Sequence, residues 1–179
     1  EGKDTTLPPL VLTAHFDHLG VDGDNNLYAG ALDNASGTAF LLELMRSYSS
    51  YSKPERNIIF AALNAEEFGL LGSKSFADKN FELIKNSQVI NFDMIGSTGY
   101  PITLMVGKSF SNKNSDLLNS IENLAKRKNI ETRVVYEDSS DHASFNNLGI
   151  DSLSFCHSDL TKIHTPNDKV EFISLSAID

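Results

Sequence analysis

Short apolar runs alternate along the chain with segments whose apolar residues recur at helical spacing. The run at 58–63 is apolar at every position and partly β-branched, which is typical of a strand buried on both faces of a sheet. On such patterns, strands are predicted at 10–15, 56–63, 88–94, 102–106, 131–136 and 150–156, with a brief extended piece at 27–32.

Helical segments occupy the intervals between these runs. The apolar residues Ala39, Leu42 and Met45 recur at helical spacing, and the segment 114–128 is amphipathic. Helices are predicted at 33–48, 69–79 and 114–128, with shorter turns at 81–86, within 139–149 and from 174 onward, and polar loops at 16–26 and 158–169. The alternation of strands and helices predicts an α/β fold, a three-layer α/β/α sandwich with a mostly parallel mixed sheet.

The length of the chain bounds its domain organisation. With 179 residues, 40% hydrophobic and 22% charged, and with neither a repeat nor a linker, the chain is expected to form one domain, residues 1–179. It begins at Glu1 without a methionine and ends inside a predicted helix, so we expect it to be a fragment of a longer protein.

Charge and cysteine content narrow the classes of partner. The net charge of -9 argues against a nucleic-acid partner, and the single Cys156 excludes an internal disulfide and a cysteine-rich zinc site. Because no apolar run approaches the ~20 residues of a membrane span, we expect no membrane contact from this fragment. Location and oligomeric state stay open: the parent protein would be secreted or at the cell surface if it carries a signal peptide, and otherwise cytoplasmic.

Metal-ligating residue types recur at or just after the ends of predicted strands. They are His15 with Asp17, Asp33, Glu66 with Glu67, Asp93, and His164. The carboxyl ends of strands are where open α/β sheets bind ligands, and two adjacent carboxylates are costly there unless a positive charge shares the site. A set of imidazoles and carboxylates suits zinc, with manganese and cobalt as alternatives, better than the all-oxygen sites of calcium or magnesium.

Each of these residues has a simpler interpretation when it is taken alone. Asp33 is compatible with a helix N-cap, Asp93 with a strand-end turn, and His164 with a turn histidine. Two other segments are read in the simpler way: His18 as a solvated side chain, and 140–142 as a helix cap followed by a surface histidine. It is the recurrence at five strand ends that favours a metal site.

The same residues carry a resemblance to a known family. The ordered stretches HFD at 15–17, ALDNASG at 31–37, NAEEFGLLGS at 64–73, NFDMIG at 91–96 and HTPND at 164–168 resemble the M28 family of zinc aminopeptidases over nearly the whole chain. The resemblance implies two zinc ions bridged by Asp33. His15 and Asp93 would complete the site of one ion, and Glu67 and His164 that of the other.

The resemblance also implies an activity, the hydrolysis of N-terminal residues from peptides that have a free N-terminus. Glu66 would be the general base that takes a proton from the attacking water. Asp17 would hydrogen-bond the ring of His15 and fix its orientation. The peptide bond between Asp33 and Asn34 would be cis. The whole chain would then be a single metallopeptidase catalytic domain.

Other functions stay open at this point. A related zinc carboxypeptidase, a glutaminyl cyclase-like enzyme and a metal-free binding homologue are the alternatives. The absence of tryptophan and the intact Glu66–Glu67 pair disfavour the cyclase, and no basic residue stands in a recognisable place to hold the carboxylate of a carboxypeptidase substrate. Some relatives have a tyrosine before the last histidine, where this chain has Ile163. The stretch SSDH at 139–142 also resembles a segment near the active site of relatives, which stays open as the alternative to a cap and a surface histidine. The substrate-binding residues are not predicted.

Overall fold

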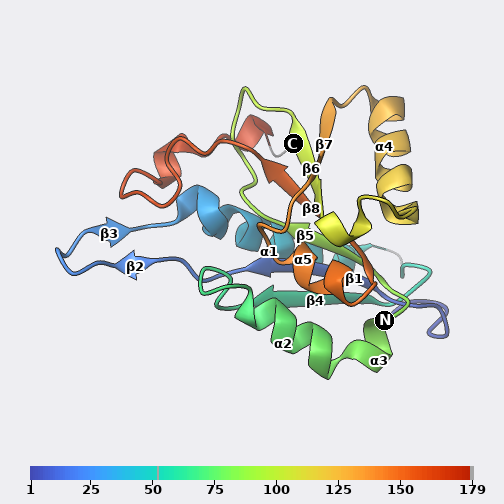
Figure 1. Cartoon of the computed structure of the whole chain (residues 1–179). Helices are drawn as coiled ribbons and strands as arrows, with labels where there is room; N and C mark the ends of the chain where they lie inside the picture. Colours follow the sequence, from blue (N-terminus) through green and yellow to red (C-terminus); the bar gives the residue numbers. More distant parts are fainter. Residues whose placement is uncertain (52, 178–179) are drawn as a thin grey trace.

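A six-stranded sheet forms the centre of the molecule within residues 1–51 and 53–177, which the computed structural model describes (Figure 1). In spatial order its strands are β4 (Ile58–Leu63), β1 (Leu10–His15), β5 (Gln88–Phe92), β8 (Asp151–His157), β6 (Ile102–Val106) and β7 (Thr132–Tyr136). Neighbouring strands run parallel except β6 and β8, which are antiparallel. The predicted mostly parallel mixed sheet is therefore confirmed.

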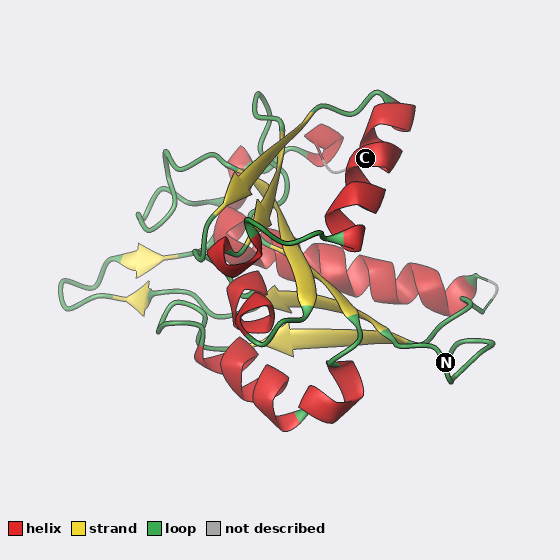
Figure 2. Ribbon diagram, turned by 45° about the vertical axis from the view of Figure 1, so that its right-hand side comes forward, coloured by secondary structure: helices red, strands yellow, loops and turns green. Residues whose placement is uncertain are grey.

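Helices cover both faces of this sheet (Figure 2). The helices are α1 (Gly37–Ser50), α2 (Leu71–Lys79), α3 (Phe81–Ile84), α4 (Asp116–Lys128) and α5 (His142–Asn147). Alternate strand residues point to opposite faces. Accordingly, Leu12 of β1 packs with Leu41 of α1, whereas its neighbour Val11 packs with Ala77 of α2 and Phe145 of α5. The apolar runs thus form core clusters on both faces of the sheet, as a three-layer α/β/α sandwich requires.

The first helix begins later than its sequence pattern predicts. A π-helical turn at Ala31–Ser36 precedes α1, and Asp33 and Asn34 within it have non-helical backbone angles. The Asn34 amide takes over the backbone pairing, because its Oδ1 accepts from the amides of Gly37 and Met94 and its Nδ2 donates to the carbonyl of Phe92. The interpretation of Asp33 as an ordinary N-cap is therefore wrong. The Asp33–Asn34 peptide bond is cis, as the resemblance implies.

Two segments outside the sheet also differ from the sequence prediction. The strands β2 (Gly20–Val21) and β3 (Leu27–Tyr28) form a hairpin that projects from the body, where a loop and an extended piece are predicted (Figure 1). The predicted final helix is a single 3-10 turn at Leu175–Ala177, and residues 178–179 lie outside the described residues. No helix in the described ranges is long and apolar enough to cross a membrane.

The carboxyl ends of the parallel strands lead into tightly constrained connections. Ala65, Met94 and His164 each have a positive φ of 54–59°, a left-handed conformation that costs a non-glycine residue on the order of 1–3 kcal/mol. Each of them is, or lies within two residues of, a predicted metal ligand. These three unfavourable backbone conformations therefore lie at the edge of the sheet where the predicted site lies, whereas those of Asn25 and Asn129 lie elsewhere.

Candidate metal centre

Three predicted ligands from separate segments converge at this edge of the sheet. His15 ends β1, Asp93 follows β5, and Asp33 lies in the π-helical turn. The Nε2 atom of His15 is 3.4 Å from Asp33 Oδ1 and 3.5 Å from Asp93 Oδ1. All three side chains are buried, and Asp93 Oδ1 has no hydrogen-bond partner within the described residues. One ligand atom from each lies within 4.8 Å of the others, close enough to share one ion.

The second carboxylate oxygen of Asp33 faces a different group of side chains. Its Oδ2 is 3.1 Å from Nε2 of His164, which is also 3.1 Å from Glu67 Oε2. Asp33 thus stands between His15 and Asp93 on one side and Glu67 and His164 on the other. A carboxylate that presents one oxygen to each of two ligand groups suits a bridge between two cations.

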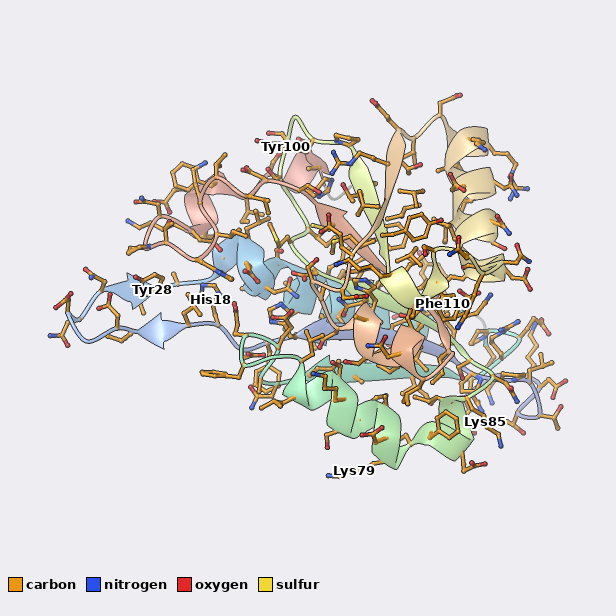
Figure 3. The ribbon with its side chains drawn as sticks, in the orientation of Figure 1. His18, Tyr28, Lys79, Lys85, Tyr100 and Phe110 are labelled. Carbon is orange, nitrogen blue, oxygen red and sulfur yellow. The ribbon has the colours of Figure 1, made fainter. Side chains whose placement is uncertain are left out.

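His18 joins this second group, contrary to its interpretation as a solvated residue. Its Nδ1 is 2.8 Å from Glu67 Oε1, and its side chain is only 9% exposed. Figure 3 shows His18 at the base of the projecting hairpin, where the hairpin leaves the body of the molecule. One ligand atom each from His18, Asp33 and Glu67 also lies within 4.8 Å of the other two. The pattern of apolar positions held no signal for this contact, which joins residues 49 positions apart.

Burial and the crowding of carboxylates shift the pKa values of the centre. Although burial disfavours the charged ring, the adjacent carboxylates of Asp33 and Asp93 raise the pKa of His15 to about 12. Burial raises the pKa of Glu66 to about 8, against the opposing charge of His15. Burial and the nearby Asp33 also raise the pKa of Glu67. A centre of this composition, with an unpartnered buried oxygen on Asp93, fits divalent cations.

Asp17 contacts the centre differently from the expected way. Its carboxylate is 3.6 Å from Nδ1 of His15, too far for a hydrogen bond, and the ring nitrogen instead lies 3.2 Å from the Asp17 backbone carbonyl. The carboxylate accepts hydrogen bonds from the backbone amides of Glu66 at 3.1 Å and Glu67 at 3.2 Å. Asp17 therefore holds the segment that carries a predicted ligand and the predicted base.

Asp168 is a functional residue to which the sequence assigned no role. Its carboxylate is almost completely buried and accepts hydrogen bonds from the amides of Leu32, at 2.7 Å, and Asp33, at 3.0 Å. It therefore fixes the backbone at the residue that faces both ligand groups. Its place four residues after His164 in the HTPND stretch was the only available signal.

The interpretation of the segment 140–142 as a cap and a surface histidine is wrong. Ser140, Asp141 and His142 are all buried, and Asp141 makes no capping hydrogen bond. The Ser140 hydroxyl instead donates to Asp93 Oδ2 at 2.6 Å, which orients this carboxylate. His142 Nε2 donates to the Glu137 carbonyl at 2.9 Å. The segment thus packs against the centre as a buried support.

A cavity of about 320 Å³ opens beside the predicted ligands. Glu66 lines it together with four of the predicted ligands, so the predicted base and the candidate metal centre face one space. Its other walls are mainly apolar and include Met105, Val135 and Ile163, and Arg133 also lines it. A cavity of this size and lining is typical of sites that bind small ligands.

Known proteins share both the sequence pattern and the fold. The sequence model of Peptidase family M28 matches residues 1–179. Aminopeptidase YwaD of Bacillus subtilis (strain 168) is 32% identical over 182 residues, covering 96% of this chain and 38% of that protein. The solved structure of BSAP, a zinc aminopeptidase from Bacillus subtilis, superposes with a TM-score of 0.81 at 28% identity, covering 99% of this chain and 44% of that one. The chain spans less than half the length of both proteins.

A further likeness concerns the fold alone. The structure of Bacteroides thetaiotaomicron glutaminyl cyclase bound to N-acetylhistamine has a TM-score of 0.78 at 23% identity, covering 95% of this chain and 68% of that one. At this identity the chemistry of that enzyme does not transfer to this chain. The side chains described above carry the functional argument.

Proposed function

The chain belongs to peptidase family M28, and we propose that it is the catalytic domain of a dizinc aminopeptidase that releases the N-terminal residue of a peptide. One observation carries the proposal: the two carboxylate oxygens of Asp33 face separate groups of ligands. His15 and Asp93 would hold one ion, and Glu67 and His164 the other. Manganese or cobalt would also suit these donors.

The residues of the chain define the chemistry at this centre. When bound, the zinc ions would supply a Lewis acid for the scissile carbonyl and lower the pKa of water. Glu66 would take a proton from the attacking water as the oxygen adds to the carbonyl carbon. It would then deliver this proton to the leaving nitrogen as the carbon–nitrogen bond breaks. Asp17 supports these steps because it holds the Glu66 backbone.

The acidic surroundings explain the proposed requirement for a free N-terminus. Glu66, Asp93 and Glu67 all line the cavity beside the ligands. Carboxylates attract a protonated α-amine and offer acceptors for its hydrogen bonds. An N-acetylated substrate has neither the charge nor the three donors. It should therefore not be hydrolysed.

The number of ions and the role of the base are tested together. Elemental analysis of zinc-loaded protein should find two ions per chain, and an amino-acid 4-nitroanilide with a free amine should be hydrolysed. The Glu66→Gln variant should keep its zinc and lose on the order of 10²–10⁴-fold in kcat. Glu82→Gln is the matched control, because that side chain is 81% exposed on α3. One ion per chain would refute the dizinc assignment, and full activity in Glu66→Gln would refute the base.

A further inference from the structure

The strand register gives the position of Arg133 relative to the candidate metal centre, on the opposite side of the cavity. Asp93 donates its backbone amide to Phe155 of β8, and in the next row Cys156 pairs with Thr103 of β6, which pairs with Arg133 of β7. Neighbouring strands lie about 4.8 Å apart, so three spacings place the Arg133 backbone ~14 Å from that of Asp93. A long substrate side chain and an extended arginine can bridge this gap together.

The side chain of Arg133 is available to a ligand. It is exposed and lines the cavity, and no ion pair or hydrogen bond engages it within the part of the chain that the structure describes. Arg46 behaves differently, because both its Nε and its Nη2 donate to Glu43. Glu137 also lines the cavity, but it lies one residue past the end of β7, and its Oε2 accepts a hydrogen bond from the Ser139 hydroxyl at 3.4 Å.

The wall between the ligands and Arg133 is apolar and ends in polar groups. Met105, Val135 and Cys156 form this wall. Beside Arg133, the hydroxyls of Thr103 and Ser158 lie 2.7 Å apart, and Ser158 also lines the cavity. A substrate side chain that matches this order has an aliphatic stem and an anionic tip. Arginine binds a carboxylate through two parallel hydrogen bonds, which a lysyl ammonium cannot form.

We propose that Arg133 determines the specificity of this cavity and that the enzyme prefers glutamate at the cleaved N-terminal position. Glutamine ranks next, because its carboxamide oxygen accepts one hydrogen bond. Lysine is disfavoured, because its charge repels the guanidinium. Aspartate has the charge but a stem one carbon shorter, so it falls short of Arg133. The inference rests on the proposed aminopeptidase function, whose substrate class it names.

The test compares substrates on the zinc-loaded protein. The rates of hydrolysis of the 4-nitroanilides of glutamate, leucine and lysine are measured with the unmodified protein and with the Arg133→Gln and Arg133→Glu variants. The expected kcat/KM for glutamate exceeds that for lysine at least 10-fold, which corresponds to about 1.4 kcal/mol. Arg133→Gln should lower the glutamate value about 10-fold, mainly through KM, and leave leucine within twofold. Arg133→Glu should invert the preference.

Matched variants and the leucine substrate separate the outcomes. Arg127 is an exposed arginine on α4 outside the cavity, so Arg127→Gln and Arg127→Glu should leave the glutamate-to-lysine ratio unchanged. If the leucine substrate is hydrolysed but the glutamate-to-lysine ratio is unchanged in the Arg133 variants, Arg133 does not determine specificity. The inference is then refuted while the proposed aminopeptidase function stands. If no free-amine substrate is hydrolysed, the proposed function fails and the inference falls with it. Arg133-dependent cleavage of an N-acetylated dipeptide would overturn both in favour of a carboxypeptidase.

Discussion

Replacement of Asp168 should weaken both the fold and the metal centre. Its carboxylate accepts two buried hydrogen bonds, from Leu32 and from Asp33. A hydrogen bond to a charged group contributes roughly 1.5–3 kcal/mol, so Asp168→Ala should lower the free energy of unfolding of the metal-free protein by roughly 3–6 kcal/mol. Asp168→Asn keeps one acceptor oxygen and should lose about half as much. Urea denaturation measures both changes.

Asp151 supplies the control for this experiment. It also accepts two hydrogen bonds, from Ser115 Oγ and the Leu117 amide, but at the start of β8, on the opposite edge of the sheet from the metal centre. Asp151→Ala should therefore destabilise the fold and leave zinc affinity unchanged. Asp168→Ala should weaken zinc binding as well, because it frees the backbone of Asp33. Two ions bound to Asp168→Ala with unchanged affinity would refute this positioning role.

Three further perturbations address the same centre. With pKa values of about 12 for His15 and about 8 for Glu66, both side chains are protonated at pH 7 without metal. Zinc binding should therefore release about two protons, and zinc affinity should increase as pH rises. Calorimetry in two buffers of different ionisation enthalpy measures this release, and a finding of no released protons would contradict the prediction. His18→Ala removes a contact to Glu67 and should weaken one zinc ion about 10–100-fold while the other stays bound, which a zinc titration would show. Gly37→Ala would place a Cβ 2.3 Å from a side-chain oxygen and 2.4 Å from a backbone oxygen, so urea denaturation should show a loss of at least about 1–3 kcal/mol.

The positions of the sheet strands were predicted well from the sequence, because a buried strand consists of a local run of apolar residues. The strands β1 and β6 lie where the runs at 10–15 and 102–106 place them, and β4 begins two residues later than predicted. The connections were less predictable, because side chains from distant segments decide them. The start of α1 depends on the Asn34 amide, which pairs with residues up to 60 positions away. No periodicity reports such a contact.

The residues of the candidate site likewise include some that local sequence patterns revealed and others that they did not. The predicted ligands His15 and Asp93 were found because they stand at strand ends, and Asp33 because it follows the predicted extended piece at 27–32, although the structure places it in a π-helical turn. Their roles stay predictions, but the structure brings them together. The burial of His18 and Asp168 was not foreseen, because a polar residue is buried only when a distant partner satisfies it. Such partners become visible only in the folded chain.

The hydrogen bonds between Asp168 and the turn at Asp33 also constrain the order in which the protein becomes functional. They join residues 135 and 136 positions apart, and His164 reaches the centre from the same late segment. During synthesis, His15, Asp33, Glu67 and Asp93 emerge long before their last companions. Contacts of such separation form late because a long loop must close first. The proposed second ion would therefore gain its His164 ligand only at a late step of folding, whereas the side chains proposed for the first ion do not depend on His164.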